Sequence, residues 1–326
     1  MAKNLVEFKN LKTYFYTGGG IVKAVNDVSF NIREGQTVCV VGESGCGKSV
    51  TAMSLMKLIP NPPGKIVGGE ILFNGKDILK FSDEELRHMR GNEVSVIFQE
   101  PMTSLNPVFK IGDQLCEAII LHQKLSKQEA AEKAIEVLKI TGIPRAEEIM
   151  KSYPHELSGG MRQRVMIAMA VSCNPKLLIA DEPTTALDVT IQAQILDLMR
   201  DIKKKLNTSI MLITHDLGVV AEMADYVVVM YAGKVIEEAP VEELFKNPLH
   251  PYTQGLLKSK PLLTEETGDR LYSIPGQVPN PIGMPDNCYF NSRCDRCMNK
   301  CKDAQPTLIN VNPTHKVSCW LYEEGK

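Results

Sequence analysis

The feature that most constrains the fold is a glycine-rich loop at residues 42–49, which reads Gly-Glu-Ser-Gly-Cys-Gly-Lys-Ser. It follows the apolar run Thr37–Val41, which suits a buried strand, and it precedes SVTAMSLMKLI, whose apolar residues have helical spacing. In this strand–loop–helix context the pattern G-x-x-x-x-G-K-[ST] is typical of a phosphate-binding loop. Its glycines let backbone N–H groups converge on phosphate oxygens, and the helix N-terminus adds a favourable dipole. The chain is therefore predicted to bind nucleotide phosphates.

Two side chains of this loop are expected to carry most of its chemistry. Lys48 would neutralise the β- and γ-phosphates, and the Ser49 hydroxyl would bind Mg²⁺. Cys46 is expected to be a passive small residue. The residues expected to contact the nucleotide are Gly42, Ser44, Gly45, Cys46, Gly47, Lys48, Ser49 and Val50.

An acidic pair follows a second buried strand. The apolar run Leu177–Ala180 ends in Asp181 and Glu182. A carboxylate at the C-terminal edge of a parallel strand points into the crevice where ligands bind in open α/β sheets. We expect Asp181 to bind Mg²⁺ and Glu182 to polarise the water that attacks the γ-phosphate.

Composition and charge exclude several classes of protein. The 326 residues include 44% hydrophobic and 23% charged residues, which argues against extensive disorder. The net charge of −2 argues against a nucleic-acid-binding protein. The longest apolar runs reach seven residues, whereas a membrane span needs about twenty. No signal peptide is visible, so we expect a cytoplasmic protein, or one attached to a membrane through partners.

The order of patterns predicts an α/β fold. Two alternating segments, LVEFKNLKTYF and VKAVNDVSFNI, predict early strands, and buried strands alternate with helices after Pro175. We expect an α/β core that contains the phosphate loop, a helical insertion and a small cysteine-rich C-terminal extension. The expected division is residues 1–100 and 166–240 for the core, 101–165 for the insertion, and 241–326 for the extension.

A second helix start rich in small residues indicates the class of nucleotide-binding protein. Residues 157–164 read LSGGMRQR, and the chain here resembles the ATP-binding cassette (ABC) family, whose signature is LSGGQ. The resemblance spans nearly the whole chain. It implies a P-loop NTPase (RecA-like) α/β core with an antiparallel β subdomain, and it implies hydrolysis of Mg-ATP. In that family two cassettes sandwich two ATP molecules, each held between one chain's phosphate loop and the other chain's signature. It implies that Ser158, Gly159 and Gly160 act on the partner's nucleotide.

Other family landmarks are placed by the same resemblance. Gln99 is similar to the Q-loop glutamine that contacts Mg²⁺ or the attacking water, and Asp188 to the D-loop aspartate at the dimer interface. His215 resembles the switch histidine that contacts the γ-phosphate and orients the catalytic glutamate. An N-terminal aromatic residue should stack on adenine. Phe15 is the expected residue, with Tyr14 and Tyr16 as alternatives.

The C-terminal segment of the chain resembles one particular group within the ABC family. Residues 247–253, NPLHPYT, precede a proline- and cysteine-rich tail, as in the ATP-binding subunits of dipeptide, oligopeptide and nickel importers. The implied partners are a second cassette, expected to be a different chain although a homodimer stays open, two transmembrane permease subunits and, indirectly, a substrate-binding protein. The implied location is the cytoplasmic face of the cell membrane. We expect His250 to be structural, at a helix start.

Five of the nine cysteines fall between residues 288 and 319. In a reducing compartment such a group favours a metal site over disulfides. Four of them match the cluster-binding pattern of the peptide-importer subunits: Cys288, Cys294, Cys301 and Cys319. Four thiolates could hold either a [4Fe–4S] cluster or Zn²⁺, and the spacing lacks the two paired motifs C-x₂-C…C-x₂-C of zinc ribbons, which favours iron. Cys297 is an additional thiol that could replace Cys294 or Cys301.

Several alternatives stay open at this point. The transported solute could be a peptide, nickel or another compound, because the cassette does not touch it. A cassette ATPase of DNA repair or translation is disfavoured, since only 109 residues separate Lys48 from Ser158 and only one cassette is present. A small-molecule kinase with a phosphate loop would leave LSGGM and His215 unexplained.

Overall fold

The computed structural model of the chain describes residues 3–99, 104–185, 187–259 and 272–323. The chain divides into two compact units. The helical unit comprises residues 1–3, 33–36 and 80–213, and the strand unit comprises residues 4–32, 37–79 and 214–326. Glu100, Pro101 and Ala186, which flank the predicted landmarks Gln99 and Asp188, lie outside the described residues.

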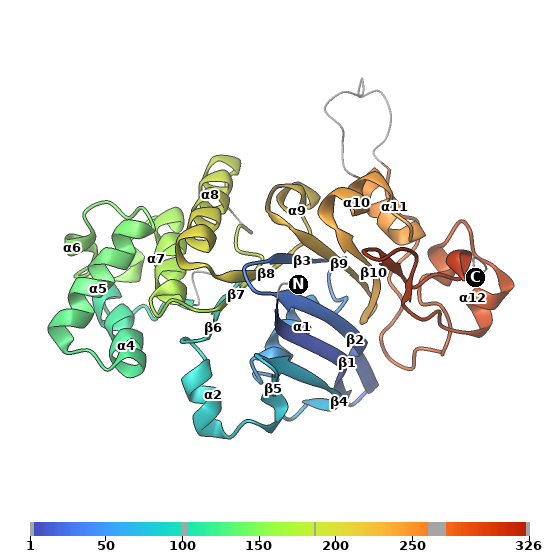
Figure 1. The fold of residues 1–326 in the computed structure, drawn as a ribbon, viewed down its shortest axis with the longest axis horizontal. Helices are drawn as coiled ribbons and strands as arrows, with labels where there is room; N and C mark the ends of the chain where they lie inside the picture. The colour runs from blue at the N-terminus through green and yellow to red at the C-terminus, as the bar shows by residue number, and fades with distance from the viewer. Residues whose placement is uncertain (1–2, 100–103, 186, 260–271, 324–326) are drawn as a thin grey trace. The chain divides into compact units, whose positions relative to one another are not determined.

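The helical unit combines parallel strands with packed helices. Strand β6 pairs with β7, and β7 with β8, all in parallel. Helices α4, α5 and α7 pack on one another (Figure 1). Its elements are α2 (Asp83–Met89), β6 (Val94–Ile97), α4 (Ile111–Gln123), α5 (Lys127–Ile140), α6 (Ala146–Ile149), α7 (Gly159–Val171), β7 (Leu177–Asp181), α8 (Val189–Leu206) and β8 (Ser209–Thr214).

Local sequence signals set the helix starts in this unit. Ser82 and Glu85 form a reciprocal capping box at the start of α2, and Ser126 and Glu129 form another at the start of α5. Each box satisfies two backbone N–H groups that the first turn of a helix leaves without intrahelical partners.

The strand unit contains the other elements in two sheets. One sheet has the order β2-β1-β4-β5, and in the other β3 pairs in parallel with β9, which pairs antiparallel with β10. Strand β12 joins β10 to β11. Its elements are β1 (Asn4–Thr17), β2 (Gly20–Arg33), β3 (Thr37–Val41), α1 (Lys48–Leu55), β4 (Gly64–Phe73), β5 (Lys76–Asp77), α9 (Leu217–Met223), β9 (Tyr226–Tyr231), β10 (Lys234–Pro240), α10 (Val241–Lys246), α11 (Pro251–Lys258), α12 (Asn299–Asp303), β11 (Ile309–Asn310) and β12 (Lys316–Val317).

Strand β4 was not expected from the sequence. Its ladder with β1 shifts register between Lys9 and Thr13, where the strands are irregular. Gly69 lies there at φ +86°, and a Cβ atom on it would come within 2.4 Å of the Asn10 carbonyl oxygen. A bulge of this kind breaks the two-residue alternation from which a strand is recognised.

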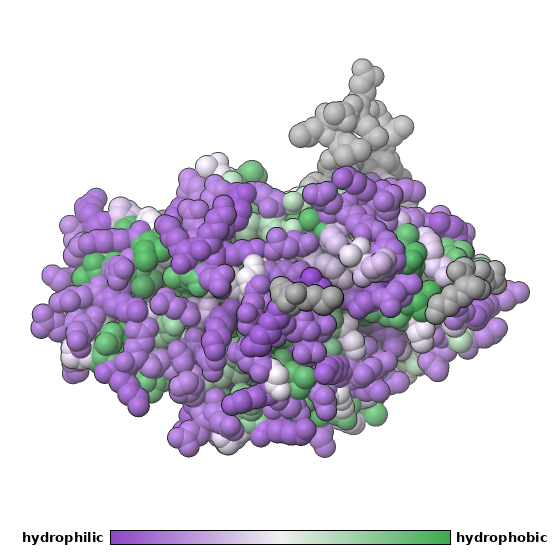
Figure 2. All heavy atoms as spheres, in the orientation of Figure 1, coloured by the Kyte–Doolittle hydropathy of each residue, from purple (hydrophilic) through white to green (hydrophobic). Residues whose placement is uncertain are grey.

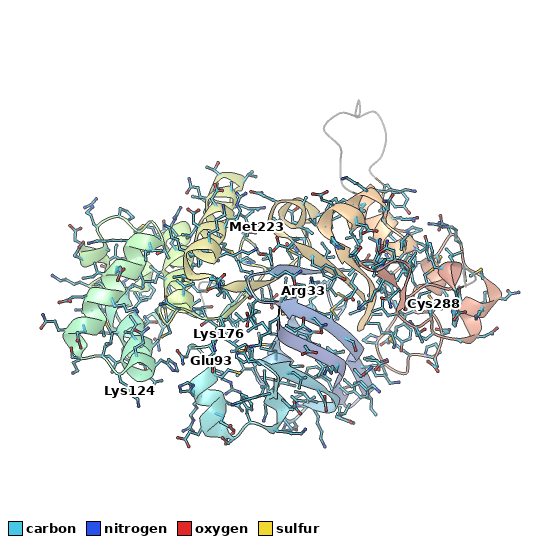
Figure 3. All side chains as sticks on the ribbon, viewed as in Figure 1. Arg33, Glu93, Lys124, Lys176, Met223 and Cys288 are labelled. Atoms are coloured by element: carbon cyan, nitrogen blue, oxygen red, sulfur yellow. The ribbon has the colours of Figure 1, made fainter. Side chains whose placement is uncertain are left out.

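Burial follows the strands closely in both units. Strands β3, β7 and β8 are buried along their whole length. Hydrophilic residues cover most of the visible surface (Figure 2), and Lys176 and Glu93 form one ion pair of the helical unit at 2.8 Å (Figure 3). No helix among the described residues is both long and apolar enough to cross a bilayer.

Candidate functional site

The phosphate loop in the strand unit depends on two glycines. Gly42 has φ +149°, and a Cβ atom there would lie 2.2 Å from the Met230 carbonyl oxygen. Gly47 has φ +100°, and its Cβ atom would lie 2.3 Å from the Ala24 carbonyl oxygen. Only glycine fits such close backbone approaches at positive φ. The loop is therefore held tightly between β2 and β9.

The side chains of the loop divide into buried and exposed groups. Lys48 is 6% exposed, and its ammonium group donates to the carbonyl oxygens of Gly42 at 2.7 Å and Glu43 at 3.0 Å. Cys46 is buried, and burial raises the pKa of its thiol, which keeps it protonated and agrees with a passive role. Four of the predicted nucleotide-contacting residues are half-buried or exposed: Ser44, Gly45, Ser49 and Val50.

The N-terminal aromatic residues lie on different faces of β1. Thr13 shares a hydrogen bond of 2.8 Å with Ser54 of α1, so its face of the strand turns toward the helix that follows the phosphate loop. Because side chains alternate along a strand, Phe15 lies on that face, whereas Tyr14 and Tyr16 lie on the opposite face. The Tyr14 hydroxyl donates to Asn26 at 2.9 Å.

The predicted acidic pair stands at the end of β7 in the helical unit. Asp181 is 6% exposed. Glu182 has φ +48°, a conformation that L-residues rarely adopt and that is frequent at functional sites. One oxygen of its carboxylate accepts hydrogen bonds from the Gln99 side-chain amide at 3.0 Å and from the Thr185 hydroxyl at 2.9 Å. The structure thus brings the predicted Gln99 and Glu182 together.

The predicted signature residues begin helix α7 of the same unit. The Ser158 hydroxyl caps the helix by accepting the Met161 N–H at 3.3 Å. Gly160 packs against Ile191 of α8, whose first turn is capped by the Asp188 carboxylate at 3.0 Å. Among the described residues, apart from its chain neighbours and its own helix backbone, no heavy atom lies within 4 Å of a Cβ atom built on Gly159. The signature and the predicted D-loop aspartate therefore belong to adjoining helix starts.

His215 belongs to the strand unit and precedes helix α9. The residue is exposed. Its neighbours fix the turn, because the Asp216 N–H donates to the Thr214 hydroxyl at 3.0 Å and the Asp216 carboxylate caps α9. The imidazole is thus carried at the end of a buried strand on a well-defined turn.

His250 has the structural position expected for it. It is 2% exposed, and its Nδ1 accepts the Tyr252 N–H at 3.0 Å, which caps helix α11 ahead of Pro251. Its own N–H donates to the buried Glu237 carboxylate at 2.9 Å. Burial lowers the pKa of His250 to about 4, so the imidazole stays neutral near pH 7.

This lowered pKa predicts a loss of stability in acid. The unfolded chain, with a histidine pKa near 6.5, binds the proton more tightly than the folded chain, so stability is lost as pH falls below about 6.5. We expect wild-type protein to lose about 2 kcal/mol more unfolding free energy than His250→Asn between pH 7 and pH 4.5. Asn caps helices well and does not titrate.

Denaturant unfolding of both proteins at each pH measures that difference. His315 is present in both proteins, so its effect on stability cancels in the comparison. Its pKa is raised, because Glu237 and Glu243 outweigh the lowering effect of burial, and its contribution to stability therefore changes with pH in the direction opposite to that of His250. Parallel pH curves for the two proteins would contradict the assignment to His250.

The predicted cysteine ligands all belong to the C-terminal part of the strand unit, and Figure 3 labels one of them, Cys288. All nine cysteines lie within the described residues, and none of them forms a disulfide bond. The Cys288 N–H donates to the Cys301 carbonyl oxygen at 3.0 Å. Burial raises the pKa of Cys288 to about 12, and the other three expected ligands add to the shift. Among the described residues, no group of three or more His, Cys, Asp or Glu side chains is arranged to hold a metal ion.

Three residues near the loop were not identified from the sequence. Glu43 carries a carboxylate within the phosphate loop, and both Tyr252 and Arg293 contact it from the C-terminal extension. The sequence offered one indication of this contact, which is Glu43 itself. An acidic side chain in a loop that binds polyanions needs a positively charged partner. Its partner lies 250 residues along the chain, beyond any local pattern.

Comparison with known proteins agrees with this arrangement. The family described as ABC transporter matches residues 25–185, and the C-terminal region of oligopeptide/dipeptide transporters matches residues 236–301. The chain is 56% identical to the oligopeptide transport ATP-binding protein AppD of Bacillus subtilis (strain 168), over 98% of this chain and 97% of the relative. It is 49% identical to the dipeptide transport ATP-binding protein DppD of the same organism, over 99% and 96%.

A solved structure shares the fold. The dimeric ATP-binding cassette MJ0796, in a post-hydrolysis state bound to ADP and phosphate, matches 72% of this chain and 98% of its own, at 28% identity and a TM-score of 0.65. The expected α/β cassette with an antiparallel β subdomain is thereby confirmed. The chain belongs to the family of ATP-binding subunits of oligopeptide and dipeptide ABC transporters, and it is an ATP-hydrolysing cassette.

Proposed function

We propose that this chain energises the import of oligopeptides or dipeptides through a membrane transporter. The observation that carries the proposal is the match of residues 236–301 to the C-terminal region of peptide transporters, because the cassette alone is common to ABC transporters of many solutes. The names of the relatives AppD and DppD agree with a peptide cargo. The chain would act on the cytoplasmic face of the membrane, where ATP is supplied, bound to two permease subunits and fed by a substrate-binding protein.

We assign the hydrolytic roles according to the chemistry of each group. Lys48 and the loop N–H groups would bind the β- and γ-phosphates, with Ser49, Asp181 and Gln99 around Mg²⁺. Glu182 would polarise the attacking water, with Gln99 and Thr185 orienting its carboxylate. His215 would contact the γ-phosphate, and Phe15 would stack on adenine.

A second cassette would complete the nucleotide site. The Ser158 hydroxyl and the start of α7 form a small-residue helix N-terminus that can hold an anion, and this chain already has one phosphate loop. Ser158, Gly159 and Gly160 would contact the ATP of the partner cassette, with Asp188 at the interface. We propose that the partner is a different chain.

Uptake by the reconstituted transporter tests the cargo. Proteoliposomes that contain this chain with its permease, partner cassette and binding protein are expected to accumulate labelled di- or oligopeptides and to hydrolyse ATP faster when peptide is present. Stimulation by nickel ions and not by peptide would overturn the peptide assignment and leave the ATPase assignment in place.

We further propose that the C-terminal cysteines bind a [4Fe–4S] cluster. The supporting observations are the thiol chemistry of the donors and the mutual electrostatic influence of Cys288, Cys294, Cys301 and Cys319. A [4Fe–4S] cluster is larger than a single metal ion and accepts more widely spaced thiolates than a zinc ion, which needs four donors at about 2.3 Å from one point. The thiolates would hold the cluster and crosslink the extension.

Metal analysis of anaerobically purified protein tests the cluster. We expect about four irons and four acid-labile sulfides per chain, and a loss of most iron in Cys301→Ser. Cys173→Ser serves as a control that should keep the iron, because Cys173 is not among the five C-terminal cysteines. One zinc per chain, or wild-type protein without metal, would overturn the proposal.

A further inference from the structure

We propose that the C-terminal extension holds the phosphate loop in its ATP-binding shape, with Arg293 and Tyr252 as positioning residues that act through Glu43. All three residues belong to the strand unit. The proposal concerns ATP binding and does not depend on the transported solute.

Arg293 forms a two-pronged ion pair with the loop. Its Nη1 donates to Glu43 Oε2 at 2.8 Å, and its Nη2 donates to Glu43 Oε1 at 3.0 Å. The remaining Nε donates to the Pro275 carbonyl oxygen at 3.0 Å, so the guanidinium is fixed in its plane. The Arg293 side chain is 4% exposed and that of Glu43 27%. Charge pairs with this paired geometry combine strength with directional specificity.

Tyr252 holds the same loop residue by its backbone. Its hydroxyl oxygen accepts the Glu43 N–H at 2.8 Å, and the side chain is fully buried. The ring packs against Tyr231 and Phe290, with ring centroids 4.7 and 5.5 Å apart. The His250–Tyr252 turn, which marks the start of α11, therefore delivers a hydroxyl group to the phosphate loop.

Glu43 also contacts the lysine of the loop. Its carbonyl oxygen accepts a hydrogen bond from Lys48 Nζ at 3.0 Å. The side chain, N–H and carbonyl group of one residue thus connect the extension to the group expected to neutralise the phosphates. A displacement of Glu43 would alter the position of Lys48.

The pairing also solves an electrostatic problem. A carboxylate beside a bound triphosphate repels it, and the repulsion is strong where water is excluded. Arg293 cancels that charge, and Glu43 in turn makes the burial of Arg293 tolerable. Removal of Arg293 alone should leave the half-buried negative charge of Glu43 unpaired next to the phosphate site.

A double-mutant cycle tests the proposal by equilibrium binding of a fluorescent ATP analogue to the full chain. We expect Arg293→Gln to weaken binding at least about tenfold, because Glu43 is left without its counter-charge. The double variant Glu43→Gln/Arg293→Gln should recover to within about threefold of wild type, since it contains neither charge. A merely structural arginine would not give this rescue.

Two further variants keep the test sharp. Tyr252→Phe retains the packed ring, removes the oxygen that accepts the Glu43 N–H, and should weaken ATP binding by about threefold to tenfold. Lys246→Gln breaks an exposed ion pair with Glu242 in the same extension and should change nothing. Unchanged ATP binding in Arg293→Gln or Tyr252→Phe, or a double variant no better than Arg293→Gln, would overturn the proposal.

Discussion

Glu182→Gln is expected to lower the rate of ATP hydrolysis by about 1000-fold or more while ATP binding stays close to wild type. The amide has nearly the same shape as the carboxylate and can still accept hydrogen bonds from Gln99 and Thr185. It carries no charge and cannot polarise or deprotonate the attacking water. Turnover of radiolabelled ATP and equilibrium nucleotide binding, measured on the same preparation, separate the two effects.

A matched control comes from the same unit. Glu93 forms an ion pair with Lys176 at the start of the parallel strands β6 and β7, whereas the acidic turn follows the end of β7. Glu93→Gln therefore makes the same chemical change away from the site. Turnover in that variant should match wild type. Hydrolysis by Glu182→Gln within about tenfold of wild type would remove Glu182 from the role of base and direct attention to Gln99 or His215.

Lys48→Ala is expected to abolish detectable ATP hydrolysis and to weaken ATP binding at least about 100-fold. The ammonium group is buried, donates to two loop carbonyl oxygens, and would turn to the phosphates when ATP enters. Alanine supplies no positive charge and no donor. Titration with ATP by calorimetry, together with a phosphate-release assay, measures both losses.

Two substitutions refine this prediction. Lys48→Arg keeps the charge but should also fail, because the backbone approaches at Gly42 and Gly47 leave no room for the loop to widen. Lys76→Ala removes an exposed lysine of β5 and should behave as wild type. ATP binding by Lys48→Ala near the wild-type affinity would show that the loop N–H groups suffice without the lysine.

Local patterns identified most of the elements that carry the chemistry. The loop at residues 42–49 and the strand ending at Asp181 were predictable, because each depends on residues a few positions apart. Strand β4 escaped this reasoning because glycines and a bulge interrupt its alternation.

Some features follow only from the way the chain folds back on itself. The hydrogen bond between Gln99 and Glu182 joins residues 83 positions apart. The choice among the three N-terminal aromatic residues is guided by the face of β1 that turns toward α1, which the contact of Thr13 with Ser54 defines. The residues that neighbour a side chain along the chain determine neither how deeply it is buried nor which distant side chain it contacts.

The sequence by itself determined the phosphate loop, the signature and the class of the protein, because backbone geometry and helix capping are short-range properties that residue type dictates. Only the tertiary structure decided that Arg293 and Tyr252 meet Glu43, since ion pairs and buried hydroxyl contacts depend on segments 209 and 250 residues apart. Once an acidic residue enters a phosphate-binding loop, its charge must be balanced, and packing alone selects which distant cation does so.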